Sequence, residues 1–197
     1  MAEIQEELLW LCEARRAPPG APFLPLHEQD PARWDHAAIA RANDALMQAA
    51  ARRAPGPYQL EAAIQAAHVH GRLDGAVPWA GITRLYEQLL ALAPTVGARI
   101  AHAVAVAHAA PDPQAGLRLL GAIEPARVAS HQPWWAARAH LLAMAGEHDK
   151  AQLSYERAVA LDSRHTEALA GLASIAARKR EAEKARALAD RALALMP

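Results

Sequence analysis

The chain has 197 residues, of which 53% are hydrophobic and 21% charged, and its 21 basic residues balance 21 acidic ones. This is the composition of a globular protein with a buried core, and the zero net charge argues against direct nucleic-acid binding, which normally uses a basic face. No apolar run approaches the ~18 residues of a membrane span, and the single cysteine, Cys12, excludes an internal disulfide and indicates a reducing, cytoplasmic location.

The alanine-rich composition with few β-branched runs predicts helices along almost the whole chain. The stretch 17–31 is the exception, because its five prolines predict an extended segment. Pro31 suits the first turn of the next helix, which Asp30 is expected to cap. In the first half of the chain, the predicted helices are residues 3–16, 31–53, 58–70 and 79–93.

Residues 101–110 read AHAVAVAHAA, an almost wholly apolar run that alternates like a strand. A strand here would have no partner strand elsewhere in the chain. The run lies among predicted helices and ends at the sequence PDP of residues 111–113. We therefore predict a central, buried helix that is apolar nearly all round.

The second half of the chain repeats with a period of 34 residues, the length of a tetratricopeptide repeat. Small residues recur where two paired helices must approach closely. Residues 132–197 resemble this family in the order of small and bulky positions. The aligned pairs are Ala151 with Ala185, Tyr155 with Ala189, Ala158 with Ala192, Ser163 with Pro197, Gly146 with Arg180, and Trp135 with Leu169.

These patterns predict an all-α fold, a tetratricopeptide-like helical-repeat solenoid of about ten antiparallel helices. We expect a single domain over residues 1–197. Its parts would be an N-terminal helix with the proline-rich wrap (1–31), divergent helical pairs (32–130) and two tetratricopeptide-like repeats (132–197).

The histidines form no familiar metal-binding motif, since no two of them are three or four positions apart. His102 and His108 are six apart, which places them about 120° around a helix from one another. We predict no metal site and no cofactor. Trp134 and Trp135 are adjacent on a helix, so one must face a different way from the other and is a candidate for a pocket wall or a partner contact.

Several blocks of the sequence resemble the C-terminal extension of one group of extracytoplasmic-function (ECF) sigma factors. The resemblance implies an all-α, tetratricopeptide-like domain that controls transcription initiation through a protein contact or a sensed ligand. The polymerase-binding and promoter-binding regions of such sigma factors are missing here. The blocks are EQDPARWDHAAI (28–39), GPYQLEAAIQAAH (56–68), WAGITRLYEQLLALAP (79–94), AVAVA (103–107) and AARAHLLAMAG (136–146).

Three charged positions of that family's pattern are histidine here. The buried AVAVA helix is flanked by His102 and His108 where the family typically has Arg and Glu, and His140 stands where it has Asp. If the family's Arg, Glu and Asp form a buried charge network, losing all three together keeps the interior balanced, and imidazoles take over as neutral hydrogen-bonding groups. Alternatively, the three histidines are candidate acid–base groups of a refitted pocket.

Two functions remain open at this point. The first is a stand-alone sigma-extension-like protein that binds a protein partner or senses a ligand in transcription regulation. The second is a repurposed small-molecule-binding protein or enzyme of specialised metabolism, with a pocket lined by histidine and tryptophan. The candidate groove residues are Trp34, Asp35, Tyr58, Gln59, Tyr86, Trp135 and Arg138.

Overall fold

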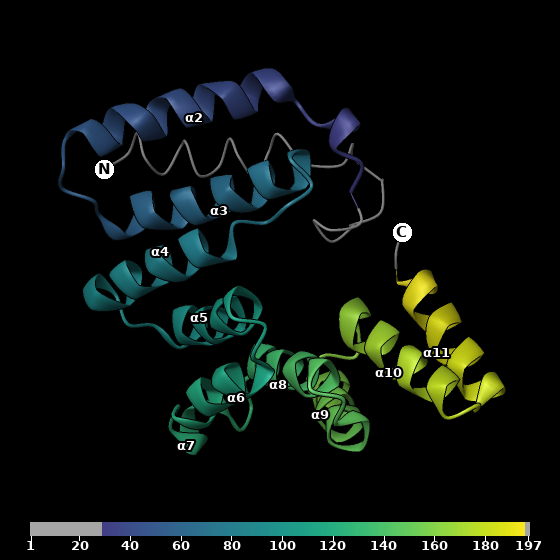
Figure 1. Ribbon diagram of the computed structural model, residues 1–197. Helices are drawn as coiled ribbons and strands as arrows, with labels where there is room; N and C mark the ends of the chain where they lie inside the picture. The colour runs from purple at the N-terminus through teal and green to yellow at the C-terminus, as the bar shows by residue number, and fades with distance from the viewer. Residues whose placement is uncertain (1–28, 196–197) are drawn as a thin grey trace. The chain divides into compact units, whose positions relative to one another are not determined.

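The computed structural model describes residues 29–195, and every regular element in that range is helical (Figure 1). The all-α prediction is therefore confirmed for this range. The predicted helix 3–16, Cys12 and the first part of the proline-rich stretch lie outside the described residues. Among the described helices, none combines the length and the apolar character that a bilayer crossing requires.

The chain divides into two compact units, Met1–Thr95 and Val96–Pro197. The assignment of all 197 residues to one domain stays a prediction. In the first unit, α2 (His36–Ala51), α3 (Pro57–Leu73) and α4 (Trp79–Leu92) follow one another, and α3 contacts both of the others (Figure 1). Short loops make consecutive helices antiparallel.

The helix predicted to begin at Pro31 is broken near its start. Pro31–Arg33 form a short 3-10 helix, η1, which Asp30 caps. The backbone is then extended at Trp34, and the carboxylate of Asp35 begins α2 by accepting a hydrogen bond from the backbone N–H of Ala38 at 2.9 Å. The prediction of one continuous helix is wrong because the extended backbone lets the Trp34 indole enter the core, while a second cap satisfies the new helix end.

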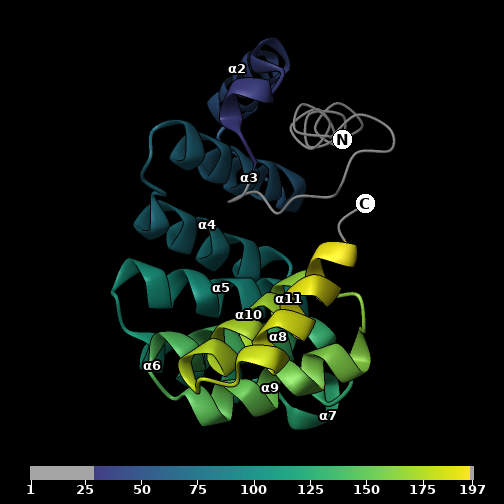
Figure 2. The same ribbon diagram turned by 90° about the vertical axis from the view of Figure 1, so that its right-hand side faces the viewer.

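Over residues 96–195, the second unit consists of three helical hairpins and a short extra helix. Its central helix is α8, which contacts α5, α6, α9 and α10 (Figure 2). The hairpins are α5 (Val96–Ala109) with α6 (Pro113–Gly121), α8 (Gln132–Met144) with α9 (His148–Leu161), and α10 (Thr166–Arg178) with α11 (Ala182–Ala194); α7 (Pro125–Val128) precedes α8.

All but the last residue of the run AHAVAVAHAA lie in α5, so the helix prediction for it is confirmed. Ala103, Ala105 and Ala107 alternate with partly buried residues because the helix is covered on more than one side. Gly116 of α6 packs directly onto this helix. A Cβ at Gly116 would lie 2.7 Å from the carbonyl oxygen of Ala103, so the small residue sets how closely α5 and α6 approach.

Two apolar clusters hold the second unit together, and both draw on α8. The α5–α8 cluster comprises Ile100, Ala103, Ala107, Leu120, Ile123, Val128 and Leu141. The α8–α10 cluster comprises Ala139, Leu142, Ala151, Tyr155, Ala158, Ala168, Leu172 and Ile175.

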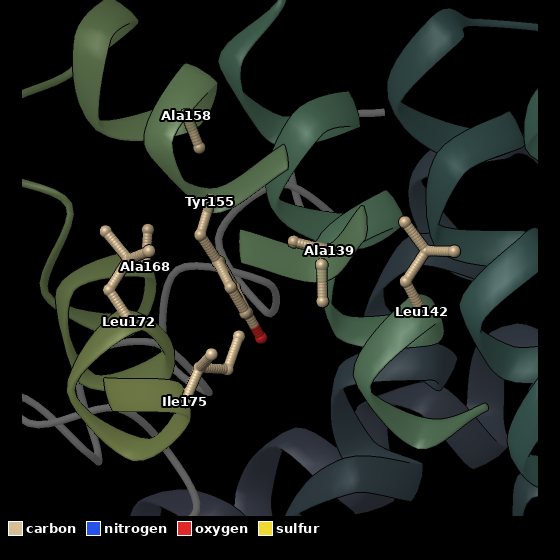
Figure 3. Close-up of a cluster of buried hydrophobic side chains, with 8 residues drawn as sticks. Ala139, Leu142, Tyr155, Ala158, Ala168, Leu172 and Ile175 are labelled. Carbon is tan, nitrogen blue, oxygen red and sulfur yellow. The ribbon is translucent and has the colours of Figure 1, made fainter. Parts of the chain in front are cut away.

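Tyr155 is the largest member of the α8–α10 cluster. Figure 3 shows its ring extending from α9 between Ala139 on one side and Leu172 and Ile175 on the other. Burial, and then the charge of a nearby glutamate, raises the pKa of the Tyr155 hydroxyl. Gly171 leaves room for the ring, since a Cβ there would lie 2.5 Å from a ring carbon. The tyrosine thus joins α8, α9 and α10.

The turns that close α8 and α10 are copies of one another, 34 residues apart. The backbone N–H of Glu147 donates to the carbonyl of Leu142 at 2.9 Å, and that of Glu181 donates to Ala176 at 2.9 Å. The residue before each donor is left-handed, with φ of 76° at Gly146 and 61° at Arg180. The alignment of Gly146 with Arg180 therefore pairs two residues with the same backbone conformation.

Candidate functional site

Two predicted groove residues of the first unit serve the fold. Trp34 is only 7% exposed and packs with Ala38, Ile39 and Val69. Its indole N–H donates to the side-chain oxygen of Gln29 at 3.1 Å. Asp35 is exposed, but its carboxylate caps α2.

The other predicted residues of this unit lie on α3 and α4. Tyr58 is 42% exposed in the first turn of α3, whereas its neighbour Gln59 is buried. Tyr86 of α4 is half-buried, and burial, followed by the negative charge of Glu61 on α3, raises the pKa of its hydroxyl. Of the three aromatic side chains predicted here, Tyr58 is the one offered to solvent.

Arg138 lies inside the α8/α9 hairpin. Its Cζ is 5.8 Å from the ring centroid of Trp134 and 6.0 Å from that of Trp135, which is cation–π range. Its Nη1 donates to the hydroxyl oxygen of Ser154 at 2.6 Å, and this buried hydroxyl donates to the carbonyl of Lys150 at 3.0 Å. The guanidinium is therefore held by two indole rings and the hydroxyl of Ser154. The sequence analysis did not predict the contact with Ser154.

The two tryptophans face different clusters, as expected for neighbours on a helix. Trp134 packs against the α5–α8 cluster and donates to the carbonyl of Leu120 at 3.2 Å. Trp135 packs against the α8–α10 cluster and donates to the carbonyl of Ala129 at 3.1 Å. Their rings meet edge to face, with centroids 4.8 Å apart. Both indoles are thus built into the fold.

Two of the three candidate histidines come together. Nε2 of His108 on α5 lies 3.1 Å from Nε2 of His140 on α8, and the ring centroids are 5.3 Å apart with an angle of 32° between the ring planes. Burial lowers the pKa of the His108 imidazole. His102 is a half-buried residue of the same helix and, six positions earlier, points about a third of a turn away from His108.

The histidine pair is accessible from solvent. His140 is exposed, and Met144, one turn later on the same face of α8, is 39% exposed. We call the surface formed by His108, His140 and Met144 the α5/α8 face. Within residues 29–195, no three His, Cys, Asp or Glu side chains are grouped as metal ligands would be.

The chain resembles a known protein in sequence over most of its length. It matches no protein-family model. Uncharacterized protein R00370 of Rhizobium meliloti (strain 1021) is 32% identical over 145 residues, which cover 73% of this chain, and the chain spans about a third of that relative's length (33%).

Solved tetratricopeptide-repeat structures cover most of the chain. TTC0263 of Thermus thermophilus, described as a thermophilic TPR protein, matches with a TM-score of 0.61 and 19% identity, over 81% of this chain and 84% of that one. MamA from Desulfovibrio magneticus RS-1 matches with a TM-score of 0.56 and 17% identity, over 80% and 85%. The fold is thus tetratricopeptide-like, as the repeat pattern predicted.

Proposed function

We propose that this chain is a protein-binding helical-repeat domain and that the α5/α8 face is part of its partner surface. The observation that carries the proposal is the composition of the central helix, whose exposed residues include Met144 and His140. Methionine is enriched in the cores of protein interfaces, where its flexible thioether adapts to a partner. A histidine beside it adds a hydrogen-bonding group without a fixed charge.

The fold supports a binding role. Stacked helical hairpins present a continuous face to a partner, as repeat arrays generally do. A related solved structure, YrrB, is described as a TPR protein with an unusual peptide-binding site; its TM-score is 0.50 and it is 16% identical, covering 80% of this chain and 77% of that one. The likeness to YrrB supports the class of function and leaves the site on this chain to its own residues.

The partner we propose is a component of the transcription-initiation machinery. The support for it is the resemblance of blocks 56–68, 79–94 and 136–146 to the ECF sigma-factor extension. The last of these blocks contains both His140 and Met144. Two of the three residues of the proposed α5/α8 face therefore belong to a block that carries the resemblance.

The test is a binding measurement with purified RNA polymerase from the same host, both as core enzyme and with its sigma factors. We expect the immobilised chain to bind one of these forms. The variant Met144→Glu should weaken binding at least tenfold, which corresponds to about 1.4 kcal/mol or more for a central interface residue. Leu153→Glu is the matched control, because Leu153 is 66% exposed on the neighbouring helix α9.

The outcomes separate the two parts of this proposal. Unchanged affinity of Met144→Glu would place the partner surface elsewhere, as would an equal loss of affinity in the control Leu153→Glu, because the effect would then not be specific to the α5/α8 face. Failure of every polymerase form to bind would overturn the transcription partner. Binding that Met144→Glu weakens and Leu153→Glu leaves intact would support both parts.

A second candidate function rests on the facing imidazoles of His108 and His140. At a Nε2···Nε2 distance of 3.1 Å, one of the two rings must donate and the other accept, so one hydrogen lies between the two ring nitrogens. Such a pair suits acid–base work on a small molecule near neutral pH. Native mass spectrometry of the protein from its own host tests this, since a retained small molecule should be lost in His108→Ala and His140→Ala.

A further inference from the structure

We propose that the imidazoles of His108 and His140 form a two-ligand site for a divalent transition-metal ion of the Ni²⁺, Cu²⁺ and Zn²⁺ class. This site goes beyond the partner binding proposed above and does not depend on it. The two ligands come from different helices and are 32 positions apart in the chain.

The distance between the two nitrogens fits a metal ion. With metal–nitrogen bonds of about 2.0–2.1 Å, two Nε2 atoms that are 3.1 Å apart subtend an angle of about 95–100° at the ion. This angle lies between the 90° of square-planar or octahedral neighbours and the tetrahedral angle. The ring centroids are 5.3 Å apart, so the two rings now point almost end to end, and both must turn for their lone pairs to converge on the ion.

Both ligands stand on rigid backbone. His108 follows Ala107, and His140 lies between Ala139 and Leu141, all three of which are fully buried. Ala107 and Leu141 belong to the same α5–α8 cluster, which fixes the separation of the two helices at this point. A site whose ligands are positioned by a packed core loses little conformational entropy when the ion binds.

Ion binding also requires one particular tautomer of each ring. A metal ligand must present a bare Nε2, with its hydrogen on Nδ1. In the metal-free pair one Nε2–H donates to the other Nε2. The donating ring must shift this hydrogen from Nε2 to Nδ1 before its Nε2 can bind the ion.

The remaining coordination positions are open to water, because His140 is exposed. Imidazole nitrogen selects Ni²⁺, Cu²⁺ and Zn²⁺, whereas Mg²⁺ and Ca²⁺ require oxygen ligands. With two protein ligands, the affinity should follow the order Cu²⁺ above Ni²⁺ and Zn²⁺.

A second histidine that meets a side chain of another helix offers a matched control. In the first unit, Nε2 of His70 lies 2.9 Å from the amide nitrogen of Asn43. An amide nitrogen is not a metal ligand, so this contact resembles the His108–His140 contact in geometry and lacks its coordination chemistry.

The experiment is calorimetric titration of the tag-free full chain with NiCl₂, ZnCl₂ and MgCl₂ in a non-coordinating buffer. We expect one Ni²⁺ or Zn²⁺ site that His108→Gln or His140→Gln weakens at least about tenfold, since loss of a hydrogen bond behind a ligand already costs that much. His70→Gln should bind the ion like the wild type, and Mg²⁺ should not bind at this site. Circular dichroism of each variant confirms that it is folded.

Electron paramagnetic resonance of the Cu²⁺-loaded chain gives an independent readout. The spectrum should show two equatorial imidazole nitrogens in the wild type and fewer in either glutamine variant. The proposal is overturned if the wild type binds none of the three transition metals. It is also overturned if the glutamine variants bind as tightly as the wild type, because the other histidines of the chain would then hold the ion.

Discussion

The helical hairpins α8/α9 and α10/α11 have different kinds of side chain at equivalent positions between their helices. At two positions where the first hairpin has Arg138 and Ser154, the second has Leu172 and Leu188, each 34 residues later. Arg138 donates to the buried Ser154 hydroxyl, while the two leucines belong to or pack against the α8–α10 cluster. The repeat thus accepts either two hydrogen-bonded polar side chains or two leucines at these equivalent positions.

The same comparison shows what each solution requires. A guanidinium taken out of water must be hydrogen-bonded and paired with other groups, and Arg138 has Ser154 and two tryptophan rings for this purpose. The two leucines at the equivalent positions need no hydrogen-bonding partners, because they have no polar side-chain atoms. We therefore expect the α8/α9 hairpin to be the more sensitive of the two to changes in a single residue.

The largest loss of stability should come from Tyr155→Ala, which gives α9 the residue that α11 has at the equivalent position. The second hairpin has Ala189 at the equivalent position, but in the first the tyrosine ring fills the space that Gly171 leaves open. We expect the free energy of unfolding to fall by about 3–5 kcal/mol, as for other buried aromatic residues. Urea denaturation measures it, with Leu153→Ala on the same helix as a control that should change stability by less than about 0.5 kcal/mol.

A double-mutant cycle between Arg138 and Ser154 sharpens the comparison directly. Ser154→Leu alone should cost about 1–3 kcal/mol, because it leaves a half-buried arginine without its acceptor. Adding Arg138→Leu recreates the leucine pair of the next hairpin and should recover much of this loss. The coupling energy in urea denaturation should reach about 0.5–3 kcal/mol, and additive effects would show that the two side chains do not act as a pair.

Exchanging the turn residues should have a smaller effect. Gly146 and Arg180 share a left-handed backbone conformation, which costs a residue with a Cβ about 1 kcal/mol or more. Arg180→Gly should therefore raise the free energy of unfolding by about 1 kcal/mol, and Gly146→Arg should lower it by a similar amount. Thermal unfolding of the two variants would contradict this if both moved the midpoint in the same direction.

The smallest expected effect is a change in the pH dependence of stability. Burial lowers the pKa of His108 in the folded chain, whereas in the unfolded chain it titrates near about 6.5. The unfolded state therefore binds more protons once the pH falls below about 6.5, and stability declines from there until the folded-state pKa is passed. His108→Gln should remove this part of the decline, so the free energy of unfolding of the wild type minus that of the variant should be larger at about pH 8 than at about pH 5.5.

The fold could be predicted from the sequence because residues of the same kind recur at regular spacings along the chain. The 34-residue spacing located both C-terminal hairpins and aligned Gly146 with Arg180, and the apolar content of 101–110 outweighed its strand-like alternation. The break at Trp34 was missed, because a cap at Asp30 and another at Asp35 look alike in sequence. Only the contact of the indole with the core decides which cap begins the long helix.

The candidate site was harder to predict, since it depends on contacts between helices. Arg138 and Trp135 were expected in a groove, yet Ser154, 16 positions away from Arg138, draws the guanidinium into the hairpin. The three unusual histidines were singled out as a group, and the structure brings two of them together. Which two of them meet depends on how α5 and α8 are rotated against each other, and no spacing within one helix contains that information.

The arrangement of α8 has a consequence for how this chain can vary in evolution. Neighbouring residues of this helix belong to different clusters, with Trp134 and Leu141 on one side and Trp135 and Leu142 on the other. An insertion of one residue inside α8 would turn everything after it by about 100°. Both clusters and the histidine pair would lose their register together, so changes in length among descendants of this sequence should collect in the turns and leave α8 unchanged.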